Sequence, residues 1–429
     1  MTAPKPRAIV VLTGSELVRG DRADENGVFL ARELSRLGVA PARILLVGDD
    51  PAELEDAVRE GFEADLCILS GGLGPTHDDR TVETMARAAG VGLEVDETLE
   101  REIEAVSRLV ARRVRRPYAE FSAGVRKQAS VPAGGLALGL AGTAPAVLLE
   151  RDGQLTVALP GPPNELRRLW PRVLESAAMS RLLARVDRPS HRLLRLFGPG
   201  ESSVASVLEE TGGEQEGLEV TVCAHDLEIR VDVFARPEAE EQADRLAALL
   251  AARFESELFA EDERPVAELV LDRCRALGLT LATAESCTGG LVGARLTDVP
   301  GSSDVYLGGV VAYSNEVKRG ALGVPDEVLS THGSVSAEAA GAMAEGARSR
   351  LGTDVAVAVT GVAGPGGGTP DKPVGLVYFH AAGPRGEWTS SVRLTGDREA
   401  VRARATALAL HGLRTLLTRP GADARDSSR

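Results

Sequence analysis

Short aliphatic runs alternate with amphipathic segments along most of the chain. Near the N-terminus, "AIVVL", "ARILLVG" and "DLCILSGG" are typical of buried strands, and the intervening "NGVFLARELSRLGV" and "ELEDAVREGF" have apolar residues at helical spacing. After about residue 265 the same alternation returns, with the runs "LTLATA", "VYLGGVVAYS", "DVAVAVTG" and "PVGLVYFHA". Strands that alternate with helices predict mostly parallel sheets covered by helices on both faces.

The middle of the chain has a different pattern. The segment "LEVTVCAHDLEIRVDVFAR" predicts a hairpin that turns near His225 and Asp226, and a helical segment follows it. An acidic, proline-containing stretch at 261–265 then indicates a boundary. We therefore predict an α/β protein with two α/β domains of mostly parallel sheets, joined by a small α+β middle module. The predicted limits are 1–170, 175–258 and 265–420.

Composition narrows the class of protein. The 49 Lys+Arg against 63 Asp+Glu give a net charge of -14, which argues against a general binder of nucleic acid or of anionic membranes. The one basic stretch, 108–117, spreads its arginines around a helix axis and is expected to be solvated or to contact another domain. The four cysteines share no CxxC spacing, so neither a zinc site nor a disulfide framework is indicated. Without a secretory signal or a membrane span in the sequence, we expect a cytoplasmic protein.

The stretch "TAESCTGGL" holds the first candidate chemistry. Ser286 falls at the turn between a predicted strand and a predicted helix, where ligands bind in open α/β sheets. Free N–H groups at the helix start, with Gly289 and Gly290 permitting close approach, suit an oxyanion or a phosphate. The alternative, which spacing alone favours, is that Ser286 or Thr288 only caps the helix.

A nucleophilic serine also needs a base, because its hydroxyl is almost fully protonated at neutral pH. The six histidines fall in no familiar catalytic pattern, but a lysine can serve if burial lowers its pKa. "YSNEVK" offers Tyr313 and Lys318 just after a predicted strand, although a surface lysine is the alternative that spacing alone favours. Cys287 is the rival nucleophile, with no evident partner histidine.

A glycine-rich segment, "TGVAGPGGGTPDKPVG" at 360–375, lies between two strong strand patterns. It is too short and too closely bracketed by strands to act as a domain linker, and we expect its backbone amides to converge on an anion. Because it does not match GxxxxGK[ST], hydrolysis of nucleoside triphosphates is not supported.

The stretches "AESCTGGL", "PGSSDVYLGGVVAYSNEVK", "HGSVSAEAAGAMAEGAR" and "VTGVAGPGGGTPDKPVGLVYF" together resemble the CinA family, whose C-terminal domain is a nicotinamide-nucleotide amidase. The resemblance implies that the carboxamide of nicotinamide mononucleotide is hydrolysed, without a cofactor, to nicotinic acid mononucleotide and ammonia. It makes Ser286 the nucleophile, Lys318 its base and Tyr313 an aid to proton transfer or orientation. Residues implied in substrate binding, the two arginines through the phosphate, are Cys287, Thr288, Gly289, Gly290, Gly364, Gly366, Gly367, Gly368, Thr369, Arg398 and Arg402.

The N-terminal half has its own group of carboxylates. "VGDD" and "LSGGLGPTHDDRT" each follow a predicted strand, and carboxylates beside glycine turns suit a hydrated divalent ion that bridges a pyrophosphate. The alternative for any single aspartate is a cap or a turn. The candidates are Asp49 and Asp79 for the metal, and Gly71, Gly72, Gly74 and Asp78 for the nucleotide.

This half resembles the molybdopterin-binding fold that forms the first domain of CinA proteins, through "TGSELVRGDRADENGVFLARELSRLGV", "SGGLGPTHDDRTVE" and "LPGPPNEL". The resemblance implies a pyrophosphatase that cleaves ADP-ribose with a divalent metal, expected to be Mg²⁺. It also favours a homodimer.

The combined hypothesis is a bifunctional enzyme of pyridine-nucleotide recycling, with nicotinamide mononucleotide and ADP-ribose as ligands and with neither nucleic acid nor membrane as a partner. A non-catalytic nucleotide-binding or competence-associated interaction protein is the alternative from another class. A molybdopterin-processing enzyme is a third reading, suggested by fold analogy alone.

Overall fold

A computed structural model describes residues 5–186, 189–211 and 215–419. It divides into two compact units, Met1–Ser190 and His191–Arg429. The predicted second α/β domain falls in the second unit, and so does the predicted middle module from residue 191 on. Residues 175–190, predicted as part of the middle module, belong instead to the first unit, where Ala178, Met179 and Leu182 pack into its core. The predicted first domain begins at residue 1 and the predicted last domain ends at residue 420. Residues 1–4 and 420 lie outside the described residues.

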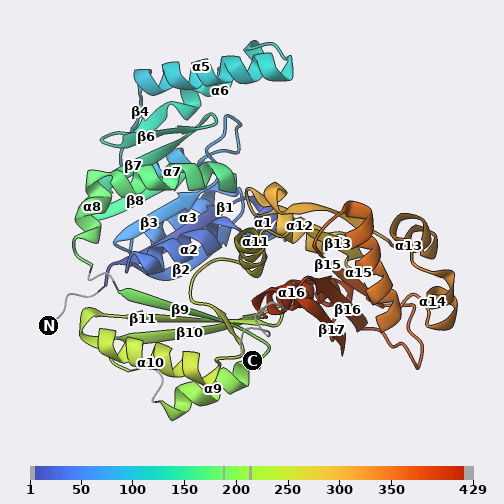
Figure 1. Cartoon of the computed structure of the whole chain (residues 1–429). Helices are drawn as coiled ribbons and strands as arrows, with labels where there is room; N and C mark the ends of the chain where they lie inside the picture. The colour runs from blue at the N-terminus through green and yellow to red at the C-terminus, as the bar shows by residue number, and fades with distance from the viewer. Residues whose placement is uncertain (1–4, 187–188, 212–214, 420–429) are drawn as a thin grey trace. The chain divides into compact units, whose positions relative to one another are not determined.

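The first unit is built around a six-stranded sheet (Figure 1). The four strands at one side run parallel and the last two pair antiparallel. Their order is β2 (Ala40–Val47), β1 (Arg7–Thr13), β3 (Leu66–Ser70), β8 (Gln154–Leu159), β7 (Ala144–Arg151) and β6 (Leu136–Ala141). A separate antiparallel pair is formed by β4 (Leu93–Val95) and β5 (Ser130–Pro132).

Helices cover both faces of this sheet, because alternate side chains of each buried strand point to opposite faces. In β1, Val10 and Leu12 belong to one core, while Ile9 and Val11 belong to the other. The first core is closed by α2 (Asn26–Arg36), α7 (Pro163–Glu175) and α8 (Ala177–Leu183). The second is closed by α3 (Pro51–Gly61), α4 (Thr81–Ala88), α5 (Glu97–Val114) and α6 (Ala119–Gln128), and a short helix α1 (Ser15–Val18) follows β1.

The second unit begins with a four-stranded sheet. The strand order is β10 (Leu218–His225), β11 (Glu228–Ala235), β9 (Ser190–Phe197) and β12 (Leu258–Ala260). β10 and β11 form the hairpin predicted from sequence, with residues 226 and 227 at its turn. The helices that contribute to its core are α9 (Glu201–Glu210) and α10 (Glu240–Arg253), with a short 3₁₀ turn η1 (Pro237–Ala239) before α10.

The rest of the second unit is an α/β domain around a five-stranded sheet. The order is β14 (Tyr306–Val311), β13 (Leu281–Glu285), β15 (Val355–Gly361), β16 (Leu376–Gly383) and β17 (Gly386–Arg393). β14, β13 and β15 run parallel to one another. β16 pairs antiparallel with β15, and β17 pairs antiparallel with β16. The parallel strands therefore end at one edge, where their following loops meet.

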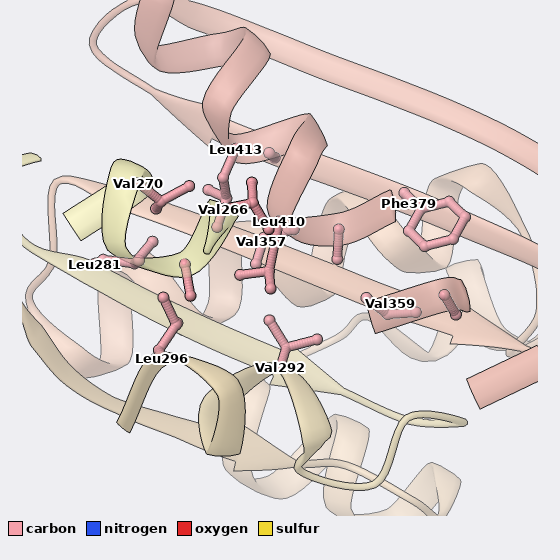
Figure 2. Packing of buried hydrophobic residues seen from close by; sticks show 14 of the residues in the cluster. Val266, Val270, Leu281, Val292, Leu296, Val357, Val359, Phe379, Leu410 and Leu413 are labelled. Atoms are coloured by element: carbon pink, nitrogen blue, oxygen red, sulfur yellow. The ribbon is translucent and has the colours of Figure 1, made fainter. Parts of the chain in front are cut away.

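Two helical layers bury the faces of this sheet. On one face, side chains of the helices α11 (Val266–Leu277), α12 (Leu291–Thr297) and α16 (Arg398–Thr418) pack on Leu281, Val357 and Val359 (Figure 2). On the other face lie α13 (Asn315–Leu322), α14 (Asp326–Thr331) and α15 (Ala337–Leu351). A short 3₁₀ turn, η2 (Ser302–Asp304), precedes β14.

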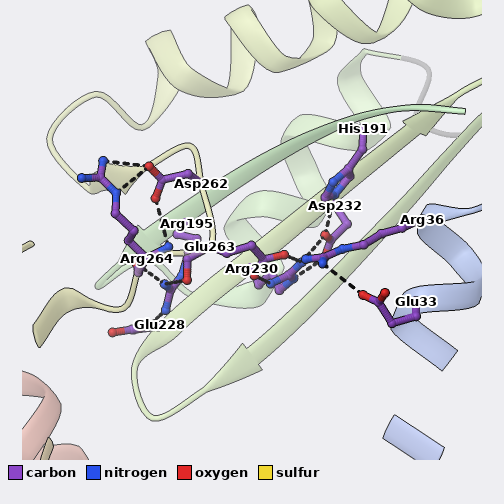
Figure 3. A network of polar contacts seen from close by, with 10 residues as sticks. All are labelled: Glu33, Arg36, His191, Arg195, Glu228, Arg230, Asp232, Asp262, Glu263 and Arg264. Carbon is purple, nitrogen blue, oxygen red and sulfur yellow. Dashed lines mark hydrogen bonds and ion pairs between the residues drawn. The ribbon is translucent and has the colours of Figure 1, made fainter. Parts of the chain in front are cut away.

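Charged side chains hold the segment that joins the two parts of the second unit (Figure 3). Arg230 of β11 binds Asp232 at 2.6 Å and also both carboxylate oxygens of Glu263. Arg195 of β9 donates to the carbonyl of Arg264 and, at 2.7 Å, to Glu228. The stretch predicted to be a domain boundary is thus fixed to the middle sheet.

The structure confirms the predicted fold class of α/β domains with mostly parallel sheets. Each of the two larger sheets also has antiparallel strands at one side. Within the described ranges, no helix combines the length and the apolar character that crossing a membrane requires.

A pair of helical glycines gives a prediction for stability. A Cβ at Gly346 of α15 would lie 2.0 Å from the carbonyl oxygen of Leu322, whereas a Cβ at Gly320 of α13 would meet nothing within 4 Å. We expect Gly346→Ala to lower the free energy of unfolding of the second unit by about 1–3 kcal/mol through overpacking. Gly320→Ala is the matched control and should raise it by up to about 1 kcal/mol through helix propensity.

The measurement is urea unfolding followed by Trp388 fluorescence. The chain has two tryptophans, so a Trp170→Phe background leaves a signal from the second unit alone. An unfolding midpoint of Gly346→Ala equal to or above that of its parent would contradict the close approach of α15 to Leu322.

Candidate active site

The turn at 286–290 connects β13 to α12. The Ser286 N–H bonds the carbonyl of Val359 on the neighbouring strand at 2.9 Å, which fixes the start of the turn at the sheet edge. Gly289 and Gly290 have φ of 62° and 99°, a left-handed conformation that glycine adopts without strain. They return the chain into α12 and leave Ser286 buried, with 8% of its surface exposed.

Lys318 lies against this turn. It belongs to the first turns of α13, which begins after Ser314, whose side chain accepts the Val317 N–H. Its Nζ is 3.0 Å from Ser286 Oγ and donates to the carbonyl of Ala312 at 2.7 Å. Lys318 is only 2% exposed, and this burial lowers the pKa of its amine below the usual 10.5. A neutral amine with its lone pair near a serine hydroxyl is the arrangement of a general base.

Cys287 is placed differently. Its thiol is buried, and this burial raises its pKa to about 11, while the N–H groups of Cys287 and Thr288 and the nearby Lys318 oppose the rise. A thiol with so high a pKa has little thiolate at neutral pH and is a weak nucleophile. Thr288 is fully buried, and its Oγ1 has no hydrogen-bond partner within the described part of the chain.

Tyr313, Arg398 and Gly364 form a second group. The Tyr313 side chain is 62% exposed, and its hydroxyl receives a 2.9 Å hydrogen bond from Arg398. Arg398 also donates to the carbonyl of Gly364 at 2.6 Å. Among the hydrogen bonds of the described residues, none joins Tyr313 to Ser286 or Lys318. The structure therefore brings Tyr313 together with the arginine rather than with the serine.

The rest of the glycine-rich segment forms an exposed loop. Gly366, Gly367, Gly368 and Thr369 are all exposed, and Thr369 closes the loop through hydrogen bonds with Lys372 at 3.0 Å. Lys372 Nζ in turn donates to the carbonyl of His332 at 2.6 Å. The loop follows β15 at the sheet edge that carries the serine turn.

Two residues hold the turn in ways that the sequence interpretation did not foresee. Glu285, the last residue of β13, is 2% exposed and accepts the N–H groups of Gly290, Val292 and Gly293 at 2.9, 3.1 and 2.8 Å. Arg402 of α16, predicted to bind phosphate, donates to the carbonyls of Cys287 and Thr288 at 3.2 and 2.9 Å.

These contacts correct two predictions. Neither Ser286 nor Thr288 caps α12: the N-cap is Gly290, which makes no side-chain cap, and the carboxylate of Glu285 takes that role. The set of amides predicted to face an anion also shrinks, because the Gly290 N–H is bonded to Glu285 and the Gly289 N–H to the Ser286 carbonyl. A glutamate directly between a buried strand and a glycine turn was the available sequence signal.

In the first unit, the predicted nucleotide and metal residues line a common cleft of about 320 Å³. Those that line it are Asp49, Asp78, Asp79, Gly71 and Gly72. Gly71 has φ of 106°, and a Cβ there would lie 2.4 Å from the carbonyl oxygen of Thr13, so only glycine fits. Gly74 lies to the side, against the Asp79 carboxylate.

The aspartates of this cleft are also held by local hydrogen bonds. Asp49 accepts the Ser15 hydroxyl, and Asp79 accepts the N–H of Thr76 at 2.9 Å. The Thr76 hydroxyl holds the pKa of Asp78 below its usual range. Asp50, which follows Asp49, caps α3 through the N–H groups of Ala52 and Glu53.

Asn26 is a cleft residue that the sequence reasoning missed. It is 9% exposed, and its amide donates to Ser70 at 3.0 Å and to the carbonyl of Gly161 at 2.8 Å. It thereby joins the end of β3 to the turn after β8. Within the described ranges, no three His, Cys, Asp or Glu side chains are close enough together to hold a metal ion by themselves.

Three parts of the chain each match the model of a known protein family. Residues 9–179 match the model of a probable molybdopterin binding domain, 191–260 that of the damage-inducible protein CinA KH domain, and 263–417 that of the CinA C-terminal domain. These matches bear out the resemblance drawn from the sequence motifs.

Individual relatives extend over the whole chain. A CinA-like protein of Mycolicibacterium gilvum is 45% identical over 97% of this chain and 99% of its own length. One of Mycobacterium tuberculosis is 42% identical over 97% and 98%. A crystal structure of a competence/damage inducible protein from Agrobacterium tumefaciens is 43% identical and covers 35% of this chain and 93% of its own, with a TM-score of 0.35. The chain belongs to the CinA family.

Proposed function

We propose that the second unit hydrolyses the carboxamide of nicotinamide mononucleotide, with Ser286 as the nucleophile and Lys318 as its base. The observation that carries the proposal is the 3.0 Å contact between Lys318 Nζ and Ser286 Oγ, made by an amine that is 2% exposed. Burial favours the neutral amine, which is the form able to take the serine proton. The substrate class comes from membership of the family, in which this domain is associated with that reaction.

The steps follow from these contacts. The carbonyl of Ala312 accepts one N–H of Lys318, so the lone pair of the neutral amine stays available to the serine hydroxyl. Lys318 takes the Ser286 proton as Oγ attacks the carboxamide carbon, and the carbonyl oxygen becomes an oxyanion. The resulting ammonium of Lys318 protonates the leaving nitrogen, so that ammonia departs and an ester to Ser286 remains. Water then hydrolyses the ester, which releases the carboxylate product and the serine.

The exposed residues Arg398 and Tyr313 suit the binding of the nucleotide rather than the hydrolysis of its carboxamide. Arg398 is exposed and lies beside Tyr313 and the glycine loop, where it can meet a substrate phosphate. Its hydrogen bond to Tyr313 would then be exchanged for one to the phosphate.

We expect Ser286→Ala and Lys318→Ala to abolish ammonia release from nicotinamide mononucleotide, because each removes one half of the nucleophile and base pair. Lys318→Arg should be equally inactive, since a guanidinium stays protonated. Cys287→Ala should keep activity, as should Cys274→Ala, a control at a buried cysteine in the core of the same domain. The wild-type rate should fall as the pH drops through the lowered pKa of Lys318, because protonation removes the base.

The measurement is ammonia release at several pH values, with circular dichroism as the check of folding. Loss of activity in Cys287→Ala but not in Ser286→Ala would contradict the assignment of the nucleophile. A folded wild type that releases no ammonia would leave the non-catalytic nucleotide-binding alternative.

For the first unit we propose a second activity, the hydrolysis of the pyrophosphate bond of ADP-ribose. It is favoured by the cleft that Asp49, Asp78 and Asp79 line together with Gly71 and Gly72. The donor set fits Mg²⁺, which is commonly bound through one or two carboxylates and completed by water and substrate phosphates. Asp49 and Asp79 would hold the ion, which supplies positive charge to the pyrophosphate oxygens. Gly71 and Gly72 let the backbone approach a phosphate closely.

We expect Asp79→Asn to lower Mg²⁺-dependent cleavage of ADP-ribose by at least about tenfold, the scale seen when support of a metal site is removed. Asp152→Asn is the control, because Asp152 lies on the exposed turn between β7 and β8. Calorimetric binding of ADP-ribose with and without Mg²⁺ gives a second readout. Equal cleavage and equal binding in the two variants would rule out Asp79 as a metal ligand.

A further inference from the structure

We propose that Glu285 and Arg402 are positioning residues that hold the 286–290 turn, one through its N–H groups and the other through its carbonyl groups, so that the N–H groups of Cys287 and Thr288 face the carboxamide oxygen of the substrate. The inference rests on the proposed amidase function and deepens it. It names the donors that stabilise the oxyanion and the side chains that aim them.

Glu285 holds the far end of the turn through backbone N–H groups. Its two oxygens accept three hydrogen bonds, from Gly290, Val292 and Gly293, all between 2.8 and 3.1 Å. These are the donors that an open helix start would offer to an anion. Because a buried carboxylate of the chain itself already occupies them, the start of α12 is closed to the phosphate of a substrate.

Arg402 holds the middle of the turn through carbonyl groups. Its Nε and Nη2 donate to the carbonyl oxygens of Cys287 and Thr288. The side chain is half-buried and reaches the turn from α16, an element that is more than a hundred residues away in sequence. Two of its three nitrogens are thereby engaged with the protein backbone, which suits a structural clamp better than a phosphate ligand.

The directions of the two remaining N–H groups of the turn, those of Cys287 and Thr288, follow from the geometry of the peptide bond. In a trans peptide, the carbonyl of one residue and the N–H of the next point in opposite directions. Since Arg402 takes the Cys287 carbonyl, the Thr288 N–H points away from Arg402. The Ser286 carbonyl accepts the Gly289 N–H, so the Cys287 N–H points away from that bond. Among the described residues, no backbone or side-chain oxygen accepts either N–H.

The Cys287 thiol connects the two N–H groups with the catalytic pair. Both N–H groups approach this thiol, and the same thiol lies near the Lys318 amine, which contacts Ser286 Oγ. Two amides and the nucleophile therefore border one small region. Paired backbone N–H groups beside a serine are the usual means of stabilising a tetrahedral oxyanion.

The test uses Glu285→Gln and Arg402→Lys in the full chain. Glutamine places an N–H₂ against backbone N–H donors, and lysine cannot bridge two carbonyls. We expect kcat for nicotinamide mononucleotide to fall about 10- to 100-fold through misplacement of the turn, with KM changed less than about twofold. The same fall should occur with nicotinamide riboside, which lacks the phosphate.

Matched controls are available in the same domain. Asp354→Asn alters a carboxylate that accepts two hydrogen bonds from Thr280 at the start of the strands, and Arg404→Lys alters an α16 arginine bound to the Thr395 carbonyl. Both should keep kcat.

Two outcomes would overturn the inference. Unchanged kcat in Glu285→Gln would show that the Glu285 carboxylate does not position the turn for catalysis. A rise in KM for the mononucleotide alone, with kcat kept, would make Arg402 a phosphate ligand.

Hydrogen exchange of the 286–293 segment provides a readout that does not need activity. It should accelerate in both variants and not in the controls. If wild type releases no ammonia from either compound but exchange accelerates in both variants, the amidase proposal fails, whereas the positioning role of Glu285 and Arg402 is kept. Unchanged exchange in the variants would overturn that positioning role. If Glu285→Gln does not fold, Arg402→Lys, which keeps the charge, decides by the same two measurements.

Discussion

The burial of a lysine amine against a serine hydroxyl is the constraint on which the second unit depends. A charged amine is costly to bury, so the burial of Lys318, which is 2% exposed, favours its neutral form and requires that its polar contacts be satisfied. The Ala312 carbonyl and Ser286 Oγ supply those contacts. Both come from the ends of adjacent parallel strands, and the lysine comes from the helix that follows one of them. The close approach of α15 to the end of α13 at Gly346 leaves this helix little freedom to shift.

The two units use similar strand-to-helix turns in different ways. In the second unit, side chains of the chain itself bind the backbone of the glycine turn after β13: Glu285 accepts its N–H groups and Arg402 donates to its carbonyls. The result is a rigid turn that presents one side chain and two N–H groups. In the first unit the glycine turn after β3 borders an open cleft that also holds aspartates. A closed turn suits covalent chemistry at one atom, and an open one suits a nucleotide with its phosphates.

Periodicity alone was sufficient to predict the alternating elements, the middle hairpin and the position of Ser286 at a strand end. It could not predict the contact with Lys318, because spacing does not report burial and a surface lysine has the same pattern; only the family resemblance paired the two. Glu285 was missed because a glutamate at the end of an apolar run also fits an exposed strand end. The role of Arg402 depends on how α16 packs across the sheet, which no local pattern encodes.

The proposed chemistry depends on a neutral Lys318, and the small number of lysines makes its protonation state directly measurable. The chain has four lysines, Lys5, Lys127, Lys318 and Lys372. In protein with ¹³Cε-labelled lysine, a pH titration by NMR would follow four signals, and Lys318→Met would identify one of them by its loss. We expect the Lys318 signal to titrate below the ordinary lysine range, because burial lowers the pKa of this amine. Titration of the Lys318 signal at 10.5 or above would mean a charged amine at neutral pH, which could not act as the base for Ser286.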